Sequence, residues 1–242
     1  MEKNLLTVNQ TDERMFYLKK MLEKVRFSHP THVFAPNIVI EARTLENVPD
    51  HATVFCGKCL DEAHALANSR DIGIFSFLTD EKFQAVNSRL TAEGALQVIL
   101  EHSVKSIADC NTLILGFGRT GAAMARILNR MDASLDIATT SSLRPAHAFA
   151  NKILPLRDFD FSPYDVVVNT VPAPIVKDAE TMTMRIPSVY VDLASKPAVN
   201  LEYARYLGVD ADIYPALPAK TCPFSAAKAM ADFILEVIKC EK

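Results

Sequence analysis

Apolar residues along the chain follow two patterns, short continuous runs and longer stretches with helical spacing. The first third holds four apolar runs and two helical stretches: residues 5–8, 32–35, 53–56 and 72–78, and residues 11–25 and 60–68. Apolar runs that alternate with amphipathic helices are typical of a parallel β-sheet with helical connections. We therefore expect a small α/β domain over residues 1–87.

A longer amphipathic helix is expected next, over residues 90–108. Five apolar residues recur on one side of it: Leu96, Ile99, Leu100, Val104 and Ile107. Thr91 is a suitable N-cap, and Glu93 lies in the first turn, where the helix dipole favours an anion. We expect this helix to link two domains, and we place the boundaries of the linking segment at residues 88 and 109.

A second alternating series fills residues 110–242. We expect its strands at residues 112–115, 135–139, 166–169, 188–193 and 209–214, and its helices at residues 121–131, 201–207 and 225–238. These elements predict a second and larger parallel α/β domain, closed by a C-terminal helix that is able to pack back on the first domain.

A glycine motif lies between the first strand and first helix of this second series. The segment Gly116-Phe117-Gly118-Arg119-Thr120-Gly121 fits the spacing G-x-G-x-x-G in the strand–turn–helix context that the motif requires. Its glycines allow a tight turn, close approach of a pyrophosphate, and close packing of helix on strand. We therefore expect an α/β protein with two Rossmann-like parallel-sheet domains, of which the second binds a dinucleotide. The corresponding turn of the first domain, residues 8–14, contains no glycine.

The end of the second strand indicates which dinucleotide is preferred. Sites for NAD place Asp or Glu there to bind the ribose hydroxyls, whereas an Arg accommodates the 2′-phosphate of NADP. Here the strand ends in small hydroxyl residues with Arg144 nearby, and Asp136 is at the opposite end. We expect NADP, with NAD left open. The expected cofactor contacts are Gly116, Phe117, Gly118, Arg119, Thr120, Gly121, Thr139, Ser141, Ser142, Arg144, Thr170, Val171, Pro172 and Leu193.

Composition excludes several other classes of protein. The chain is 49% hydrophobic and 23% charged, with a net charge of −3, which gives no reason to expect nucleic acid as a partner. No apolar run approaches the roughly 20 residues needed to cross a bilayer, and the N-terminus does not resemble a secretion signal. We expect a cytoplasmic protein and a homo-oligomer.

The five cysteines are scattered and odd in number, which argues against a disulfide framework. Cys56 and Cys59 form a C-x-x-C pair at a strand-to-helix junction. Two incidental thiols are the favoured interpretation, with a thiol-redox role as a minor alternative. The pair alone supplies too few ligands for zinc, so we expect no metal.

From about Ser76 onward, roughly two thirds of the chain resembles a protein family of spore-forming bacteria, the A subunits of dipicolinate synthase. The motifs that carry the resemblance, in order, are Asn87-Ser-Arg-Leu-Thr91-Ala-Glu93-Gly94, Leu115-Gly-Phe-Gly-Arg-Thr-Gly121, Val168-Asn169-Thr170-Val-Pro172-Ala, Val191-Asp192-Leu193-Ala-Ser195-Lys196-Pro197 and Pro215-Ala-Leu217-Pro218. The resemblance implies an oxidoreductase of sporulation, a small anionic, dihydrodipicolinate-like substrate, and a flavoprotein-like partner, the B subunit. The layout is also similar to that of 2-hydroxyacid dehydrogenases.

The chain departs from the family pattern in three places. Its N-terminal part is shorter and matches poorly. Ala198-Val199 stand where the family tends to have Gly-Gly, and Ala216 and Ala219 replace glycines of a P-G-L-P-G motif. Both altered loops follow late strands of the sheet, so the added methyl groups are expected beside the nicotinamide, where they would restrict the backbone.

Three residues are candidates for the chemistry. Lys196 follows a strand end, where a cation could hold a substrate carboxylate; a solvated lysine is the alternative. Asn169 ends an apolar strand and would place polar atoms near the cofactor, unless it serves only the turn. Glu93 could orient substrate or act as a base, although the helix dipole alone explains it. Lys220 is a weaker second cation.

Two functions remain open from the sequence. The leading prediction is an NAD(P)-dependent oxidoreductase acting on a small anionic substrate. The alternative is a catalytically silent dinucleotide-binding or regulatory subunit, which the altered loops favour. The retained stretch from Asp192 to Lys196 favours the enzyme.

Overall fold

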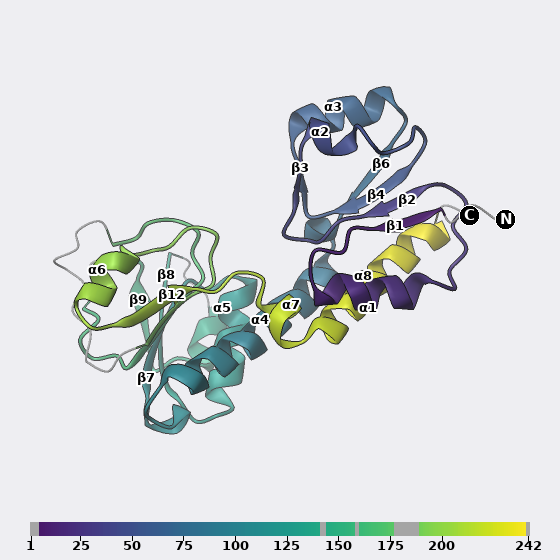
Figure 1. Cartoon of the computed structure of the whole chain (residues 1–242). Coiled ribbons are helices and arrows are strands. Elements are labelled where there is room, and N and C mark those ends of the chain that lie inside the picture. Colours follow the sequence, from purple (N-terminus) through teal and green to yellow (C-terminus); the bar gives the residue numbers. More distant parts are fainter. Residues whose placement is uncertain (1–4, 141–143, 158–159, 177–188, 241–242) are drawn as a thin grey trace. The chain divides into compact units, whose positions relative to one another are not determined.

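The computed structural model describes residues 5–140, 144–157, 160–176 and 189–240 (Figure 1). It divides into two compact units. One combines Met1–Asn87 with Pro218–Lys242, and the other is Ser88–Leu217. The C-terminal helix therefore belongs to the same unit as the N-terminal strands, although the two segments lie at opposite ends of the sequence.

The first unit is built on a parallel sheet with strand order β1-β2-β4-β6, beside a small parallel pair, β3-β5. Its strands are β1 (Leu6–Val8), β2 (Thr31–Val33), β3 (Val39–Ile40), β4 (Thr53–Cys56), β5 (Lys58–Cys59) and β6 (Gly73–Ser76). Its helices are α1 (Glu13–Leu22), α2 (Ala42–Leu45), α3 (Asp61–Ser69), the 3-10 turn η1 (Phe77–Thr79) and α8 (Pro223–Cys240). The predicted parallel α/β fold is confirmed; β3, β5 and α2 were not predicted.

Helices α1 and α8 pack side by side on this sheet (Figure 1). Asp12 caps α1 by accepting a hydrogen bond from Met15 N at 3.2 Å. Met15 of α1 and Ile234 of α8 are fully buried in one apolar core with Phe55 and Phe77. Each such side chain contributes on the order of 1.5–3 kcal/mol, so α8 is an integral part of the first unit.

Helix α4 (Glu81–His102) begins and ends earlier than predicted. The expected apolar stripe is wrong at two of its five positions, because Leu100 and Val104 are 52% and 77% exposed, whereas Ile99 and Ile107 are buried. The buried face instead uses small residues, Ala92 and Ala95, beside Ile99. Alanine is common on both buried and exposed helix faces, and it therefore gave no periodic signal.

The second unit contains a six-stranded parallel sheet in the order β12-β11-β10-β7-β8-β9. Its strands are β7 (Asn111–Leu115), β8 (Ser134–Thr139), β9 (Lys152–Pro155), β10 (Val166–Asn169), β11 (Val189–Asp192) and β12 (Asp210–Ile213). Its helices and 3-10 turns are η2 (Ile107–Asp109), α5 (Arg119–Asn129), η3 (Arg144–Ala148) and α6 (Leu201–Tyr206); α7 (Leu217–Thr221) leads back to the first unit.

Counted within this unit, the strands run 6-5-4-1-2-3, which is the strand order of dinucleotide-binding domains. The order reverses between β7 and β10, and ligands of such sheets bind at the carboxyl ends of the strands at that point. Both faces of the sheet are covered: Ile114 of β7 packs with Met124 of α5, whereas Leu113 packs with Ala204 of α6. Burial on both faces explains the continuous apolar strands.

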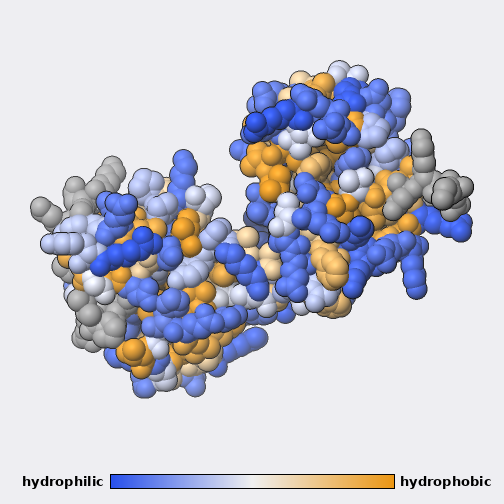
Figure 2. Space-filling model, viewed as in Figure 1, coloured by the Kyte–Doolittle hydropathy of each residue, from blue (hydrophilic) through white to orange (hydrophobic). Residues whose placement is uncertain are grey.

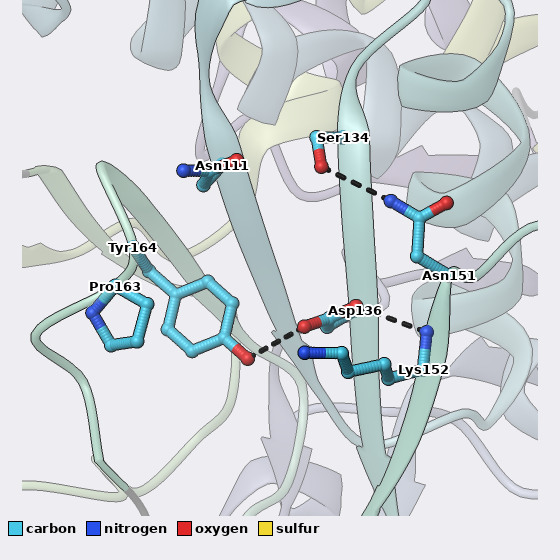
Figure 3. A pocket seen from close by; sticks show the side chains of 7 residues that line it. All are labelled: Asn111, Ser134, Asp136, Asn151, Lys152, Pro163 and Tyr164. Carbon is cyan, nitrogen blue, oxygen red and sulfur yellow. Dashed lines mark hydrogen bonds between the residues drawn. The ribbon is translucent and has the colours of Figure 1, made fainter.

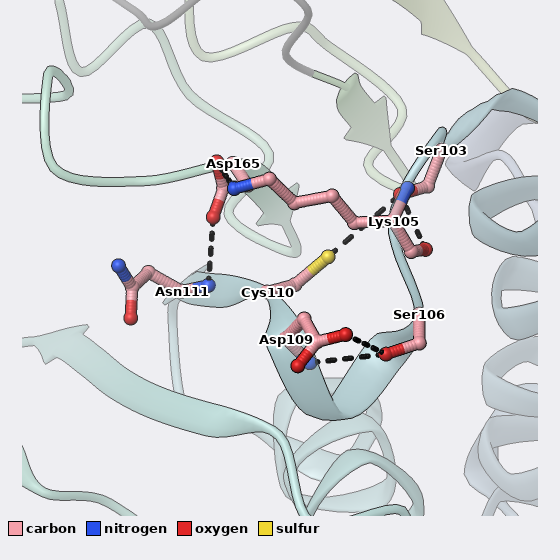
Figure 4. A network of polar contacts seen from close by, with 7 residues as sticks. All are labelled: Ser103, Lys105, Ser106, Asp109, Cys110, Asn111 and Asp165. Atoms are coloured by element: carbon pink, nitrogen blue, oxygen red, sulfur yellow. Dashed lines mark hydrogen bonds and ion pairs between the residues drawn. The ribbon is translucent and has the colours of Figure 1, made fainter.

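A polar network fixes the start of β7 (Figure 4). Asp165 is 4% exposed and accepts hydrogen bonds from Asn111 N at 3.0 Å and from Lys105 Nζ at 2.8 Å. Ser106 caps η2 by accepting from Asp109 N at 3.3 Å. The network joins the segment after α4 to β7, the strand that precedes the glycine motif.

Polar and charged side chains cover much of the face seen in Figure 2, with apolar residues between them. The large apolar side chains most exposed in the described residues are Tyr206, Val104 and Phe224. None of the described helices is both long and apolar enough to cross a membrane.

Candidate functional site

The glycine loop after β7 has the backbone geometry that its sequence predicts. Gly116 has φ +92°, a left-handed conformation that residues with a side chain rarely adopt. A β-carbon on Gly116 would lie 2.6 Å from Thr170 Oγ1 and 2.7 Å from Val171 Cγ2. A β-carbon on Gly121 would lie 2.2 Å from Gly116 O. Two of the three glycines are therefore required by close packing within the protein.

Gly118 differs from the other two, because no atom of the described residues, apart from those of Gly118 and its two chain neighbours, lies within 4 Å of the place where its β-carbon would be. Its φ is ordinary, so neither packing nor backbone strain in this structure requires glycine there. Open space over a glycine between two closely packed ones is what a cradled pyrophosphate needs.

The helix that follows is also suited to an anion. Gly118 is the N-cap of α5 and supplies no side chain to cap its amides, and the first turn carries no acidic residue. The first backbone N–H groups of a helix have no partner within the helix, and the helix dipole favours negative charge there. The residues present therefore fit a dinucleotide pyrophosphate.

The strand beside β7 brings further predicted residues to the same loop. Thr170, directly after β10, donates from both its backbone N and its Oγ1 to Leu115 O, at 2.9 and 2.8 Å. The place that a β-carbon on Gly116 would take lies against the side chains of Thr170 and Val171. Pro172 follows on an exposed turn. The structure thus places the predicted residues of β10 against the glycine loop.

Asn169 does not expose its polar atoms, contrary to the expectation from sequence. Its side chain is fully buried; Nδ2 donates to Asp192 Oδ2 at 2.9 Å and to Val171 O at 3.0 Å, and Oδ1 accepts from Val171 N at 2.9 Å. The amide shapes the turn after β10 and is not free to contact a ligand.

Lys196 lies on an exposed turn after β11, and none of the hydrogen bonds and ion pairs among the residues that the structure describes includes its side chain. Leu193, at the start of this turn, is half-buried, and its N donates to Asn169 O at 2.9 Å. Both residues follow the carboxyl end of the strand next to β10. Lys196 is therefore exposed beyond the carboxyl end of β11.

Glu93 lies in the middle of α4 and not in a first turn, contrary to the prediction. Its carboxylate is 3.3 Å from Arg89 Nη1, and both side chains are largely exposed. An exposed pair at this spacing contributes only about 0.3–0.5 kcal/mol, so the carboxylate can exchange this partner for another. Lys220, the weaker candidate, is exposed in α7.

The loop that was expected to choose between NAD and NADP is only partly described. Thr139 is half-buried at the end of β8. Ser141 and Ser142 lie outside the described residues, as does the side chain of Arg144.

Asp136, the acid of β8, is the third residue of that strand and not the first, and its contacts lie toward the starts of the neighbouring strands. It accepts hydrogen bonds from Tyr164 Oη at 2.8 Å and from Lys152 N at 3.0 Å (Figure 3). It borders a cavity of about 220 Å³, which is lined by Asn111, Ser134, Asp136, Asn151, Lys152, Pro163 and Tyr164. Because β8 and β7 are parallel and Asp136 pairs with Leu113, this acid lies beside the middle of β7 and not beside its carboxyl end, where the glycine loop begins.

The expectation that Ala198 and Val199 lie beside the cofactor is wrong. They are 0% and 4% exposed, and they pack in the apolar core with Phe161 and Tyr190. Ala216 is different, because its φ of +56° places it in the left-handed region that glycine tolerates best. Compared with glycine, Ala198 therefore adds a methyl group to the core, and Ala216 holds the backbone of a turn in a strained conformation.

The cysteine pair of the first unit is poorly suited to redox chemistry. Burial raises the pKa of the Cys56 thiol to about 12, and burial also raises the pKa of Cys59. Both thiols are free. No group of three or more metal-ligating side chains occurs among the residues that the structure describes.

Strand order and the glycine loop at the reversal point define an α/β protein of the Rossmann type. No family model matches the chain. In sequence it is 24% identical over 209 residues to the A subunit of dipicolinate synthase from Bacillus subtilis (strain 168), a match that covers 83% of this chain and 69% of that protein. The resemblance predicted from the motifs is confirmed.

Solved structures show the same fold. The crystal structure of the dipicolinate synthase A chain from Bacillus subtilis has a TM-score of 0.76 at 20% identity, covering 91% of this chain and 83% of that one. D-lactate dehydrogenase with NAD+ from Lactobacillus jensenii has a TM-score of 0.60 at 9% identity, covering 96% and 94%. At these identities the likeness concerns the fold.

Two buried residues beside the candidate site were not among the candidates from sequence. Asp192 and Tyr190 are buried at the end of β11, and Tyr190 Oη donates to Asp192 Oδ2 at 2.9 Å. The motif containing Asp192 was noticed, but the partners of its carboxylate come from a neighbouring strand and from a later turn. Such contacts leave no periodic signal in the sequence.

Proposed function

We propose that this chain is an NAD(P)-dependent oxidoreductase whose dinucleotide lies across Gly116–Gly121. The observation that carries the proposal is the open space over Gly118, at the unblocked N-terminus of α5, between two glycines that packing requires. Similar proteins support it: the A subunit of dipicolinate synthase, its solved structure, and a lactate dehydrogenase with NAD+.

Each group of residues has a role in this proposal. The N–H groups that open α5 bind the pyrophosphate, with Phe117, Arg119 and Thr120 flanking it. Thr170, Val171, Pro172 and Leu193 border the nicotinamide half at the carboxyl ends of β10 and β11. Bound nicotinamide supplies or accepts a hydride at C4.

The substrate side of the reaction depends on charged side chains of the same unit. Lys196 binds a substrate carboxylate, because its ammonium is exposed and has no partner among the described residues. Glu93 orients the substrate or accepts a proton. Asn169 acts by position, since its amide is taken up by Val171 and Asp192. Holding the reactants in place is the main contribution of such residues.

The similarity to the A subunit of dipicolinate synthase supports a small, anionic, dihydrodipicolinate-like substrate. Because that relative is named as one subunit of an enzyme, we propose that turnover requires a partner of flavoprotein type, similar to a B subunit. We expect NADP as the preferred cofactor, held by the small hydroxyl residues after β8 and by Arg144, with no acid at that end of the strand.

Equilibrium titration with NADP(H) and NAD(H) tests the cofactor site. We expect tighter binding of NADP(H), a selective loss of about tenfold in Arg144→Ala, and loss of both cofactors in folded Gly118→Val. Asp136→Asn is the control, because its contacts are at the other edge and its NADP:NAD ratio should equal that of the wild type. Equal affinities for the two cofactors would reject the NADP preference, and unchanged binding by Gly118→Val would reject the site.

Turnover is tested by following nucleotide reduction with a dihydrodipicolinate-type substrate, with and without the flavoprotein-type partner. We expect little reaction by the chain alone and clear reaction with the partner. Robust turnover by the isolated chain would overturn the need for a partner. No turnover in either case, with dinucleotide still bound, would favour the alternative of a catalytically silent dinucleotide-binding or regulatory subunit.

A further inference from the structure

The carboxylate of Asp192 is the centre of a buried hydrogen-bond network at the end of β11. The side chain is fully buried and accepts four hydrogen bonds. Oδ2 accepts from Asn169 Nδ2 at 2.9 Å, Tyr190 Oη at 2.9 Å and Ala198 N at 3.1 Å; Oδ1 accepts from Ala194 N at 3.0 Å. None of the ion pairs in the described part of the chain includes Asp192.

The two backbone donors define the turn that carries Lys196. Ala194 and Ala198 each bind one oxygen of the same carboxylate, and the three residues between them, Ser195, Lys196 and Pro197, are exposed. We call these three residues the tip. Both ends of the tip are thus held by Asp192, and Lys196 is its middle residue.

The tip is also joined to the turn after β10. The carbonyl of Ala198 accepts hydrogen bonds from Ile175 N at 2.9 Å and Val176 N at 3.0 Å. Asn169, which pairs with Asp192 in the register of β10 and β11, binds both that carboxylate and the backbone of Val171. One buried carboxylate therefore sets the relative position of the tip and of the turn that packs against Gly116.

A carboxylate in this place is costly to stability. Burying a charge without a counterion is unfavourable even when hydrogen bonds partly compensate it. Burial raises the pKa of the Asp192 carboxyl, and the hydrogen bonds from Asn169, Ala194, Tyr190 and Ala198 act in the opposite direction. An apolar residue would serve the core equally well, but it could not accept the two amides that hold the tip.

We infer that Asp192 is a positioning residue that holds the Lys196 ammonium in place to bind a carboxylate of the substrate. The inference rests on the proposed function, because it deepens the role proposed there for Lys196. A carboxylate accepts hydrogen bonds on both oxygens. The isosteric amide of Asn accepts on one only and presents an NH2 group to the other donor. Asp192→Asn should therefore release one end of the tip without creating a cavity.

The probe is pyridine-2,6-dicarboxylate, titrated against the dinucleotide-loaded full chain by calorimetry. We expect Asp192→Asn and Lys196→Met each to weaken its binding about tenfold or more, since a charge-assisted contact is lost or misplaced. In the double variant the loss should be no larger than in Lys196→Met alone, because both changes remove the same contact. Dinucleotide affinity should stay unchanged in Lys196→Met.

Tyr190→Phe is the matched control. It removes one donor to the same oxygen of Asp192 and leaves both tip amides bound. We expect it to lower stability while the affinity for the dianion remains that of the wild type. Hydrogen–deuterium exchange gives a second measurement: one of the two amides, that of Ala194 or that of Ala198, should exchange faster in Asp192→Asn, and both should exchange at the wild-type rate in Tyr190→Phe.

The inference fails if Asp192→Asn lowers stability but binds the dianion as the wild type does, or if the two losses multiply in the double variant. The proposed function fails differently. If the wild type binds no dianion, or if Lys196→Met binds it normally, the assigned role of Lys196 is wrong whatever Asp192→Asn does.

Discussion

A β-carbon on Gly121 would lie 2.2 Å from the carbonyl oxygen of Gly116, so helix α5 meets the end of β7 at a distance that only glycine permits. The same contact fixes where α5 begins, and hence where its free N–H groups point. The third glycine of the motif therefore has a structural role, whereas packing does not require glycine at the second, Gly118.

This difference separates stability from binding. We expect Gly121→Ala to lower the free energy of unfolding by about 2–3 kcal/mol, since backbone must move to admit the methyl group. Gly118→Ala should cost less than about 1 kcal/mol, the typical loss at an N-cap. Urea denaturation of both variants measures this. Equal losses of stability in the two variants would mean that Gly121 does not lie as close to Gly116 as the structure shows.

Two of the three alanines that stand where the dipicolinate synthase pattern has glycine, Ala198 and Ala216, should respond oppositely to substitution by glycine. Ala216→Gly relieves a left-handed conformation that costs about 1–2 kcal/mol, less the entropy of the freer unfolded chain, so stability should rise by about 0.5–1 kcal/mol. Ala198→Gly removes a fully buried methyl and should lose about 1 kcal/mol. Thermal unfolding of the two variants side by side gives the comparison. A stabilised Ala198→Gly would contradict its position in the core.

The elements that were predicted well from the sequence are short strands in which every residue is buried, because such a strand gives a continuous apolar run in the sequence. Strands β4 and β10 are fully buried and were predicted at their observed bounds. Strand β9 was missed, because it is a short edge strand that ends in Pro155, a residue that weakens any strand pattern. The start of α4 was missed because its first turns contain only scattered apolar residues, such as Phe83.

The candidate site shows a similar division. The glycine loop was predictable because its motif specifies backbone geometry over six consecutive residues, Gly116 to Gly121. The role of Asn169 was not, because its partner Asp192 lies on another strand and meets it only through the register of the sheet. A strand-end amide looks the same in sequence whether it faces a ligand or a buried carboxylate.

The ion pair at the start of β7 should contribute more to stability than an exposed pair. Lys105→Met removes an ammonium that lies 2.8 Å from the carboxylate of Asp165, whose side chain is 5% exposed, and we expect a loss of about 1–3 kcal/mol. Lys228→Met is the control, because Lys228 and its partner Asp232 are both 63% exposed and such a pair contributes about 0.5 kcal/mol or less. Denaturant midpoints at low salt compare them; equal losses would show that Asp165 is well solvated.

The thiol of Cys56 should be almost unreactive in the folded protein. Its pKa is raised from 9.0 to about 12, so at pH 8 its thiolate population is about a thousandfold smaller than that of an ordinary cysteine. Iodoacetamide labelling with peptide-resolved mass spectrometry should find Cys56 protected until the protein unfolds, with the half-buried Cys222 modified first. Fast labelling of folded Cys56 would revive the thiol-redox alternative for the C-x-x-C pair.

The same shift makes stability depend on pH in a defined direction. Between 9.0 and about 12 the unfolded chain loses the Cys56 proton and the folded chain keeps it. The folded state then binds more protons, so the free energy of unfolding falls as pH rises through this window. Between pH 8 and 10 this difference in proton binding should lower the free energy of unfolding by roughly 1 kcal/mol. Cys56→Ala removes it, so the stability of this variant should fall less steeply than that of the wild type over the same interval. Parallel curves for the two proteins would mean that the thiol ionises as readily in the folded chain as in the unfolded one.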